Sequence, residues 1–326
     1  MRTVVITGAA GFLGRHVAEA LLARGETVRS LDLVAPHLAG VEAITGSVTD
    51  LAIVREALQG ADGLVHAAAI ADLWVRDSAR YEAVNVEGTR TVLNAAAEMG
   101  IARAVHVSSY TTLVAGGTAE PTAPLTEDVV HPPEAMLGPY PASKRRAELV
   151  AEEMAAKGLA VSIVQPSAPI GPGDRNLTPP GRMLRDAAAG RLPAVLDCLM
   201  NVVDAASVAA GIVAALGRGA PGRRYLLTGE DIEMAELARR IAAAAGVKAP
   251  RARVPGAVAL AAARVEAGIA AITGRPPQAP LTGVRLALRR RRFSNARARE
   301  ELGFAPAPID SAIAGAVAWL RETGRL

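Results

Sequence analysis

The stretch that decides the fold is residues 3–14, TVVITGAAGFLG. Its first five residues are mostly β-branched and predict a buried strand. The residues from Arg15 to Leu22 have helical periodicity, so the glycines between them predict a tight strand-to-helix turn. Such a turn presents unpaired N–H groups at the positive end of a helix dipole, where a pyrophosphate binds. We therefore expect a dinucleotide site; the alternative is a turn with only a structural role.

Each of the three glycines is expected to have a different role in this turn. Gly8 forms the turn, Gly11 lets the backbone approach the phosphates, and Gly14 lets the helix pack closely on the strand. The spacing is GxxGxxG, whereas the commonest dinucleotide fingerprint is GxGxxG. The preceding strand and the following helix supply the context that the glycines alone lack.

Composition places the chain among globular proteins and narrows its chemistry. It has 326 residues, 51% of them hydrophobic, which suits one large or two closely joined domains. Aromatic residues make up only 3%, which disfavours a stacking surface for nucleic acid. Cys198 is the only cysteine, so we expect an inert thiol, no internal disulfide and no metal site. No signal sequence or membrane span is expected, and the predicted location is the cytoplasm.

Strands and helices alternate through the first half, which predicts an α/β fold with a doubly wound parallel sheet. The expected strands are 3–7, 27–32, 42–44, 63–66, 104–108 and 161–164, and the expected helices are 12–24, 51–59, 79–99 and 140–157. After Gln165, prolines and glycines cluster, and a second part follows that is mostly helical. Its expected helices are 181–190, 204–217, 233–245 and 255–272, with a short strand at 223–228.

Asp32 ends the second expected strand, eighteen residues after Gly14. A carboxylate in this place accepts hydrogen bonds from the adenosine ribose and repels a 2′-phosphate. The sequence therefore favours NAD over NADP; the alternative is a solvated aspartate at a strand end. His66 ends the fourth expected strand, where its apolar neighbours favour a packing residue over a catalytic base.

Tyr140 and Lys144 lie four residues apart, so they share one face of the helix expected at 140–157. An ammonium group nearby favours the phenolate, so we expect Lys144 to lower the pKa of Tyr140 and to prepare it for proton exchange with a substrate oxygen. Ser109, at the end of the fifth strand, would donate its hydroxyl to the same oxygen. The alternative is an exposed helix start without a catalytic role.

Taken in order, these motifs resemble the extended short-chain dehydrogenase/reductase superfamily. They are TGAAGFLG from Thr7, Asp32, HAAA from His66, NVEGT from Asn85, VSS from Val107, YPASK from Tyr140 and QPSAPIGPGD from Gln165. The NVVD at 201–204 and the segment 293–304 resemble later motifs of the superfamily, so the likeness covers nearly the whole chain. The dihydroflavonol reductase-like branch, which includes proteins called hopanoid-associated sugar epimerases, is the most similar.

The resemblance implies a Rossmann domain over 1–168, rejoined by 201–228, and a smaller, mostly helical substrate domain over 169–326. It implies Ser109, Tyr140 and Lys144 as the catalytic residues of hydride transfer, and a homodimer formed through the helices around 85–99 and 140–157. The residues expected at NAD are Gly8, Gly11, Phe12, Leu13, Gly14, Asp32, Ser47, Val48, Ala67, Ala68, Ala69, Asn85, Ser108, Tyr140, Lys144, Pro166 and Ser167.

Three residues depart from the pattern of the superfamily. Ser47 stands where an aspartate near adenine is common, which weakens or replaces that contact. Thr111 follows Ser109 closely and is an alternative for the serine's role. Ala168 stands where enzymes acting on nucleotide sugars usually have an asparagine, which argues against a nucleotide-sugar substrate.

The substrate is expected to be a small hydrophobic or lipid-like alcohol or ketone, because the residues expected at the cleft are apolar. These residues, for which a place in the core is an equal alternative, are Ala168, Pro169, Ile170, Leu177, Met183, Leu196, Leu199 and Met200. The basic cluster of Arg285 and Arg289–Arg292 is expected to be a solvated helix face. The alternatives are binding of a phosphate or carboxylate and contact with an anionic membrane surface. The apolar segment 254–272 is expected to be a buried helix; contact with a hydrophobic ligand or with a bilayer surface is the alternative.

Three functions remain open from the sequence. The first is an NAD-dependent oxidoreductase acting on a secondary alcohol or its ketone. The second is a sugar epimerase that returns the hydride to its substrate. The third is a nucleotide-binding sensor without catalysis, because a fold alone does not define a function.

Overall fold

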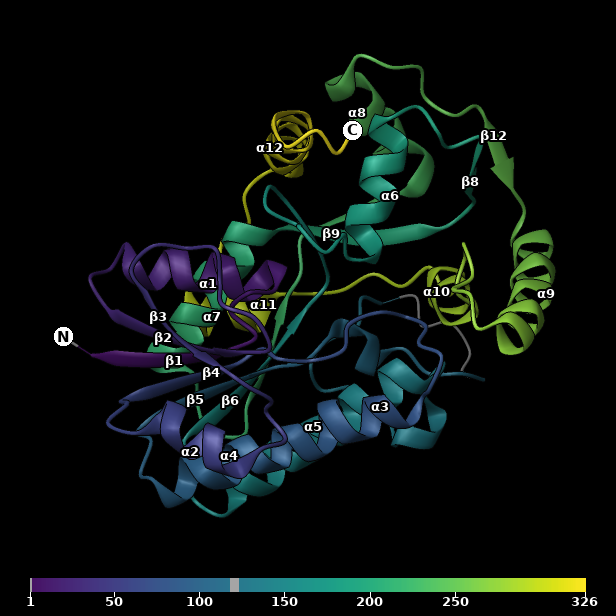
Figure 1. Ribbon diagram of the computed structural model, residues 1–326. Coiled ribbons are helices and arrows are strands. Elements are labelled where there is room, and N and C mark those ends of the chain that lie inside the picture. Colours follow the sequence, from purple (N-terminus) through teal and green to yellow (C-terminus); the bar gives the residue numbers. More distant parts are fainter. Residues whose placement is uncertain (1, 118–122) are drawn as a thin grey trace.

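The structure is a computed structural model that describes residues 2–117 and 123–326. Its centre is a seven-stranded sheet in the order β10-β6-β5-β4-β1-β2-β3, in which every neighbouring pair runs parallel (Figure 1). The strands are β1 (Thr3–Thr7), β2 (Thr27–Asp32), β3 (Val41–Thr45), β4 (Gly63–His66), β5 (Arg103–Val107), β6 (Val161–Pro166) and β10 (Arg224–Leu227). This order reverses next to β1, so the predicted doubly wound Rossmann sheet is confirmed.

Helices cover both faces of this sheet (Figure 1). On one face, α1 (Phe12–Leu22), α7 (Ala205–Arg218) and α11 (Ala296–Leu302) share a core with the strands. On the other, the core is formed with α2 (Leu51–Leu58), α4 (Gly88–Glu98) and α5 (Pro139–Ala156). Because both faces are covered, the strands are apolar on both sides, and all six residues of β6 are buried.

The helix expected over 79–99 is divided in the structure. It begins as α3 (Ala79–Tyr81), widens into the π-helical turn η1 (Glu82–Glu87), and continues as α4. The wider turn holds Asn85 inward, where its side-chain amide bonds the backbone of Ile70. Two short 3-10 turns, η2 (Tyr110–Leu113) and η3 (Pro133–Ala135), precede α5.

The second part of the chain has its own core. A three-stranded sheet is formed by β11 (Glu230–Glu233), β9 (Leu199–Asp204) and β7 (Ala168–Ile170), and a two-stranded sheet by β12 (Ala252–Val254) and β8 (Ala194–Leu196). Helices α6 (Pro179–Ala188), α8 (Met234–Ala245) and α12 (Ile309–Glu322) pack with the three-stranded sheet. Apart from the segment that returns to the first domain through α7 and β10, the sequence predicts only helices in this part. It does not predict the strands of the two small sheets, because strands of three to six residues leave little periodic pattern.

The expectation of a buried helix over 254–272 is wrong. Helix α9 (Gly256–Thr273) lies at the periphery beside α10 (Leu281–Ala287), and only Ala263 and Ala270 of its residues are buried (Figure 1). By length and composition alone, α9 is apolar enough to cross a membrane. Apolar composition indicated burial, but a helix held at the edge by one narrow face leaves its other faces exposed.

Candidate dinucleotide and catalytic site

The glycine-rich turn leaves no room for side chains at two of its positions. Gly8 has a φ of +79°, and a Cβ there would lie 2.7 Å from the amide nitrogen of Ala68. A Cβ on Gly14 would overlap the carbonyl oxygen of Gly8. The turn is closed by the amides of Gly8, which donates to Leu31 O at 3.0 Å, and Gly11, which donates to Gly8 O at 3.1 Å. The backbone around the start of α1 is therefore bare, as a phosphate site requires.

Helix α1 begins immediately after this turn. The first-turn N–H groups, which include those of Phe12, Leu13 and Gly14, have no carbonyl one turn earlier to accept them. No acidic residue occupies this turn, so nothing there neutralises the positive end of the helix. These donors fit the pyrophosphate of NAD.

Asp32 lies beside the turn at the end of β2. Its Oδ2 accepts from the amide of Ala10 at 2.9 Å and its Oδ1 from the amide of Leu33 at 2.7 Å. Each carboxylate oxygen has further lone pairs for the ribose hydroxyls of NAD. The fixed carboxylate fits NAD and opposes the 2′-phosphate of NADP.

Ser47 and Val48 follow the neighbouring strand β3. The amide of Gly46 donates to Asp32 O at 2.8 Å, which places this turn next to Asp32. The Ser47 hydroxyl is hydrogen-bonded to Thr49 at 2.7 Å, and the side chain of Val48 is buried against Gly88. The turn is therefore held by its own contacts, without the aspartate that is common in the superfamily.

Ala67, Ala68 and Ala69 continue from β4 and lie over the glycine-rich turn. The amide of Ala67 donates to Thr7 O at 3.1 Å, and that of Ala68 to the Thr7 hydroxyl at 3.2 Å. Asn85 fixes the end of this segment, because its Oδ1 accepts from the amide of Ile70 at 2.8 Å. The Asn85 Nδ2 group donates to Ile70 O and to the Ser143 hydroxyl. Asn85 therefore holds this segment in place through hydrogen bonds within the protein.

His66 has a structural environment. Its Nδ1 is 2.7 Å from the Thr7 hydroxyl and its Nε2 is 2.9 Å from the Thr89 hydroxyl. Burial, followed by the charge of Lys144, lowers the pKa of His66 to about 3. The neutral, doubly hydrogen-bonded ring supports the interpretation of a packing residue.

Ser109, Tyr140 and Lys144 meet at the carboxyl end of β5. The Lys144 ammonium donates to Val107 O at 2.6 Å, and the Ser109 side chain lies close enough to Tyr140 to lower its pKa. Ser109 and Lys144 are buried, whereas Tyr140 is partly exposed. Thr111 donates its hydroxyl to Ser109 Oγ at 3.0 Å, so it orients the serine in this structure.

The expected lowering of the Tyr140 pKa by Lys144 is wrong. Burial raises the pKa of Tyr140 above its usual value, although the nearby Ser109 side chain opposes this effect. Burial also lowers the pKa of Lys144 to about 8, against a smaller opposing effect of Glu148. Loss of water is the largest effect on both groups, so the neutral form of each is favoured.

The buried carboxylate of Glu148 binds several polar side chains next to this site. Its Oε1 accepts from the hydroxyl of Ser108 at 2.5 Å, from Thr112 at 2.9 Å and from Gln165 at 2.9 Å. Its Oε2 pairs with Arg145 at 3.0 Å. The side chain of Ser108 is therefore occupied within the protein. The sequence did not reveal this network, because Glu148 lies in the charged stretch KRRAE and no pattern shows that it faces inward.

Pro166 and Ser167 lie where β6 ends. The amide of Ser167 donates to Leu227 O at 3.3 Å, on the neighbouring strand β10. Its buried hydroxyl has no partner among the described residues. A hydrogen-bonding group is thus left at the sheet edge that would face NAD.

Two tyrosines that the sequence did not single out flank Tyr140. The rings of Tyr81 and Tyr140 have centroids 6.2 Å apart. Burial, followed by the nearby Tyr140 and Cys198, raises the pKa of Tyr110 to about 12. Burial also raises the pKa of the Cys198 thiol to about 12, so the expected inert thiol is confirmed. Tyr140 thus has two further phenols close to it, Tyr81 and Tyr110.

The apolar residues expected at the cleft divide into two groups. Ala168 and Ile170 are in the core of the second part, with Leu177, Met183 and Met200 packed against it. Pro169, Leu196 and Leu199 keep partly exposed side chains.

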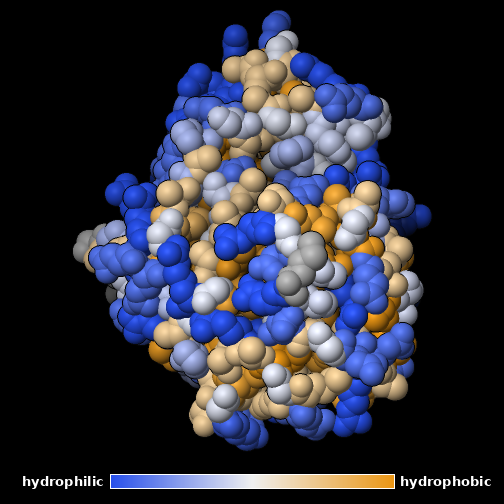
Figure 2. Space-filling model, turned by 90° about the vertical axis from the view of Figure 1, so that its left-hand side faces the viewer, coloured by the Kyte–Doolittle hydropathy of each residue, from blue (hydrophilic) through white to orange (hydrophobic). Residues whose placement is uncertain are grey.

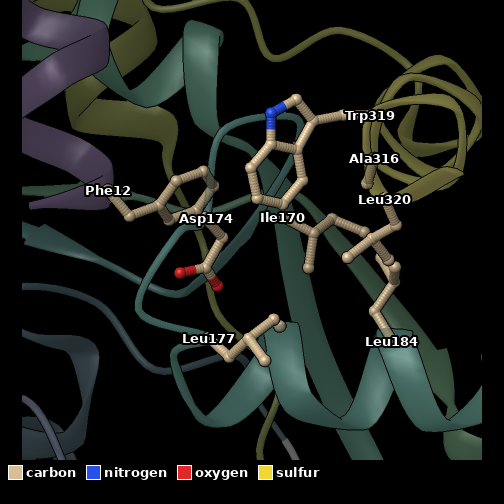
Figure 3. A pocket seen from close by; sticks show the side chains of 10 residues that line it. Phe12, Ile170, Asp174, Leu177, Leu184, Ala316, Trp319 and Leu320 are labelled. Atoms are coloured by element: carbon tan, nitrogen blue, oxygen red, sulfur yellow. The ribbon is translucent and has the colours of Figure 1, made fainter. Parts of the chain in front are cut away.

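A small pocket joins the start of α1 to the second part of the chain. Figure 3 shows Phe12 facing Trp319 of α12 and Leu184 of α6, with Asp174 and Leu177 along one side. Its free space is about 10 Å³, room for about one water molecule. The pocket is a small gap between packed side chains and is too small for an alcohol or ketone substrate.

The basic cluster is not the expected solvated helix face. Helix α10 ends at Ala287, and the arginines that follow lie outside it. Arg290 pairs with Asp197 at 3.4 Å and with Glu233, while Arg291 is buried.

The fold and site define an NAD-dependent enzyme of the extended short-chain dehydrogenase/reductase type. The chain belongs to the NAD dependent epimerase/dehydratase family, whose sequence profile matches residues 4–227. It is 32% identical to a putative dihydroflavonol 4-reductase of Synechocystis sp., over 98% of this chain and 94% of the relative. It is 33% identical to the sterol demethylase protein B of Methylococcus capsulatus, over 99% and 100%. The crystal structure of gox2253 superposes with a TM-score of 0.86 at 34% identity, covering both chains fully.

The lowered pKa of Lys144 predicts a pH dependence of stability. Its folded pKa is about 8, below the value near ~10.4 of an unfolded lysine, so between these values the unfolded chain binds more protons. The free energy of unfolding of the wild type should therefore rise from pH 8 to pH 10 relative to that of Lys144→Met. Urea unfolding of both proteins at several pH values measures this difference, and parallel pH curves would contradict the assignment.

Proposed function

We propose that this enzyme interconverts a secondary alcohol and its ketone on a hydrophobic substrate, with NAD as the cofactor. The observation that carries the proposal is the meeting of Ser109, Tyr140 and Lys144 at the carboxyl end of β5. Ligands bind outside the carboxyl ends of the strands in open α/β sheets, next to the point where the strand order reverses. The glycine-rich turn and Asp32 end at the same edge of the sheet.

The residues of the chain have distinct tasks in this reaction. When bound, the reduced cofactor NADH would supply the hydride, and the oxidised cofactor NAD⁺ would accept it. The raised pKa of Tyr140 keeps its phenol protonated at neutral pH, so in the reducing direction it donates a proton to the substrate oxygen. In the oxidising direction the deprotonated form of Tyr140 accepts that proton.

Ser109 binds the same substrate oxygen. Because Thr111 donates to Ser109 Oγ, the serine does not use its own proton on Thr111 and can donate it to an oxygen beside Tyr140. A donor fixed in this way stabilises the negative charge that develops on the oxygen during hydride transfer.

A hydrophobic substrate is supported by the surroundings of Tyr140. The Tyr81 ring lies 6.2 Å from that of Tyr140, and Tyr110 is near enough to be affected by it. Ala168 stands where enzymes acting on nucleotide sugars usually have an asparagine. The names of two relatives, a dihydroflavonol reductase and a sterol demethylase protein, describe multi-ring substrates. We therefore favour a ring-containing or lipid-like ketone over a sugar.

Native mass spectrometry with a turnover panel tests this function. We expect NAD to be bound in preference to NADP, and NADH to be consumed with ring ketones and aliphatic ketones but not with UDP-glucose. NAD that stays bound without exchange, together with UDP-sugar epimerisation, would instead establish an epimerase. Absence of turnover with every ketone and alcohol would support a nucleotide sensor.

We also propose that the protein is a cytoplasmic homodimer formed through α4 and α5. These helices pack side by side, and Leu149 of α5 is 41% exposed. The subunit count in the same native mass spectrum checks this, and a monomer at micromolar concentration would contradict it.

A further inference from the structure

Helix α9 carries an apolar stripe that the rest of the chain does not cover. Val258, Val265, Ile269 and Ile272 have exposed fractions of 58%, 64%, 54% and 88%. Their spacings of seven, four and three residues place them on one face of the helix. An apolar helix in a globular protein is normally buried, and a contiguous exposed apolar patch normally marks an interaction site.

The opposite face of α9 is attached to the protein. Gly256 lies against the side chain of Leu288, and Gly274 against Arg76. The Glu266 carboxylate accepts a hydrogen bond from the amide of Ala279, in the segment that follows α9, at 3.1 Å. The helix therefore lies along the protein, at the right-hand edge of Figure 1, and the side chains of the stripe are exposed.

The surroundings of the stripe are strongly basic. Residues 248–292 contain ten lysines and arginines and a single acidic residue, Glu266. Five of these arginines are exposed and, within the described residues, have no carboxylate at ion-pair distance: Arg251, Arg253, Arg264, Arg275 and Arg285. The side of the molecule away from α9 mixes hydrophilic and hydrophobic residues (Figure 2).

We propose that α9 docks on the surface of an anionic lipid bilayer, lying in the plane of the interface. The stripe would enter the boundary between headgroups and acyl chains, while the arginines around it contact lipid phosphates. A spanning orientation is disfavoured, because the contacts of Gly256, Glu266 and Gly274 hold the helix along the protein.

Charge selects the bilayer over a second copy of this chain. A two-fold interface through α9 would place the same patch on both sides, so the arginines of two copies would face one another. Like charges that meet across an interface are unfavourable, whereas an anionic surface neutralises them. The inference does not depend on the proposed reaction.

Sedimentation with lipid vesicles tests the proposal. The full-length protein is mixed with vesicles of phosphatidylcholine containing phosphatidylglycerol, and with vesicles of phosphatidylcholine alone. We expect binding to the anionic vesicles that weakens as salt is raised. The double variant Val265→Asn/Ile269→Asn should lower the affinity at least about tenfold, because two apolar side chains no longer enter the lipid.

Two further variants separate the contributions. Leu51→Asn/Met99→Asn changes two other exposed apolar residues, on α2 and at the end of α4, far from α9 in Figure 1, and should bind like the wild type. Arg251→Gln/Arg253→Gln/Arg275→Gln should reduce both the affinity and its salt dependence. Absence of wild-type binding, or equal binding by the Val265/Ile269 variant, would overturn the proposal. A dimer that this variant dissociates, without vesicle binding, would assign the stripe to a second copy.

Discussion

Tyr140→Phe is expected to reduce kcat by about 10²–10⁴-fold, the usual contribution of general acid–base catalysis. The variant keeps the aromatic ring that lies 6.2 Å from that of Tyr81, but it lacks the proton that the substrate oxygen needs. NAD affinity should change by less than about threefold, because the glycine-rich turn and Asp32 are untouched. Steady-state kinetics and NAD titration by fluorescence measure the two effects separately.

Tyr110→Phe is the matched control for this prediction. Tyr110 is also a phenol with a raised pKa near Tyr140, and its ring packs edge-on against Phe293. Removal of its hydroxyl should reduce kcat by less than about tenfold, because it transfers no proton. Full activity in Tyr140→Phe, or an equal loss in both variants, would show that Tyr140 is not the acid.

Glu148→Ala is expected to lower the free energy of unfolding by about 3–5 kcal/mol, the cost of breaking a buried ion pair. The change would leave the buried guanidinium of Arg145 without its inner partner. It would also remove the acceptor for Ser108, Thr112 and Gln165. Guanidinium chloride unfolding measures the loss.

Glu152→Gln is the control for the Glu148 variant. Glu152 also pairs with Arg145, at 2.8 Å, but its side chain is 32% exposed. A partly exposed pair contributes little, so the expected loss is below about 1 kcal/mol. Similar losses in the two variants would mean that the buried network around Glu148 does not stabilise the fold.

The sequence predicted the nucleotide half of the molecule well, because its signals are local. The strand, turn and helix around Gly8–Gly14 are contiguous, and both Gly8 and Gly14 occupy places where a Cβ does not fit. The alternation of strands and helices predicted the parallel sheet. The common motif order connected Ser109 with Tyr140 and Lys144, which the structure brings to one sheet edge.

Three features could not be predicted from the sequence, because they depend on the tertiary surroundings of the residues. The pKa of Tyr140 depends on how much water the folded chain removes, and spacing to Lys144 carries no such information. Glu148 lies among charged neighbours in the sequence, and only packing reveals that it faces inward. The composition of α9 is that of a core helix, and only its place at the edge leaves the stripe exposed.

The most direct test of the catalytic site is a crystal structure of the enzyme with NAD bound. We predict the pyrophosphate at the start of α1, the adenosine ribose on Asp32, and the nicotinamide ring beside the hydroxyls of Tyr140 and Ser109. A nicotinamide ring that lies away from these hydroxyls, or a Tyr140 hydroxyl that faces bulk solvent, would contradict the proposed hydride-transfer site.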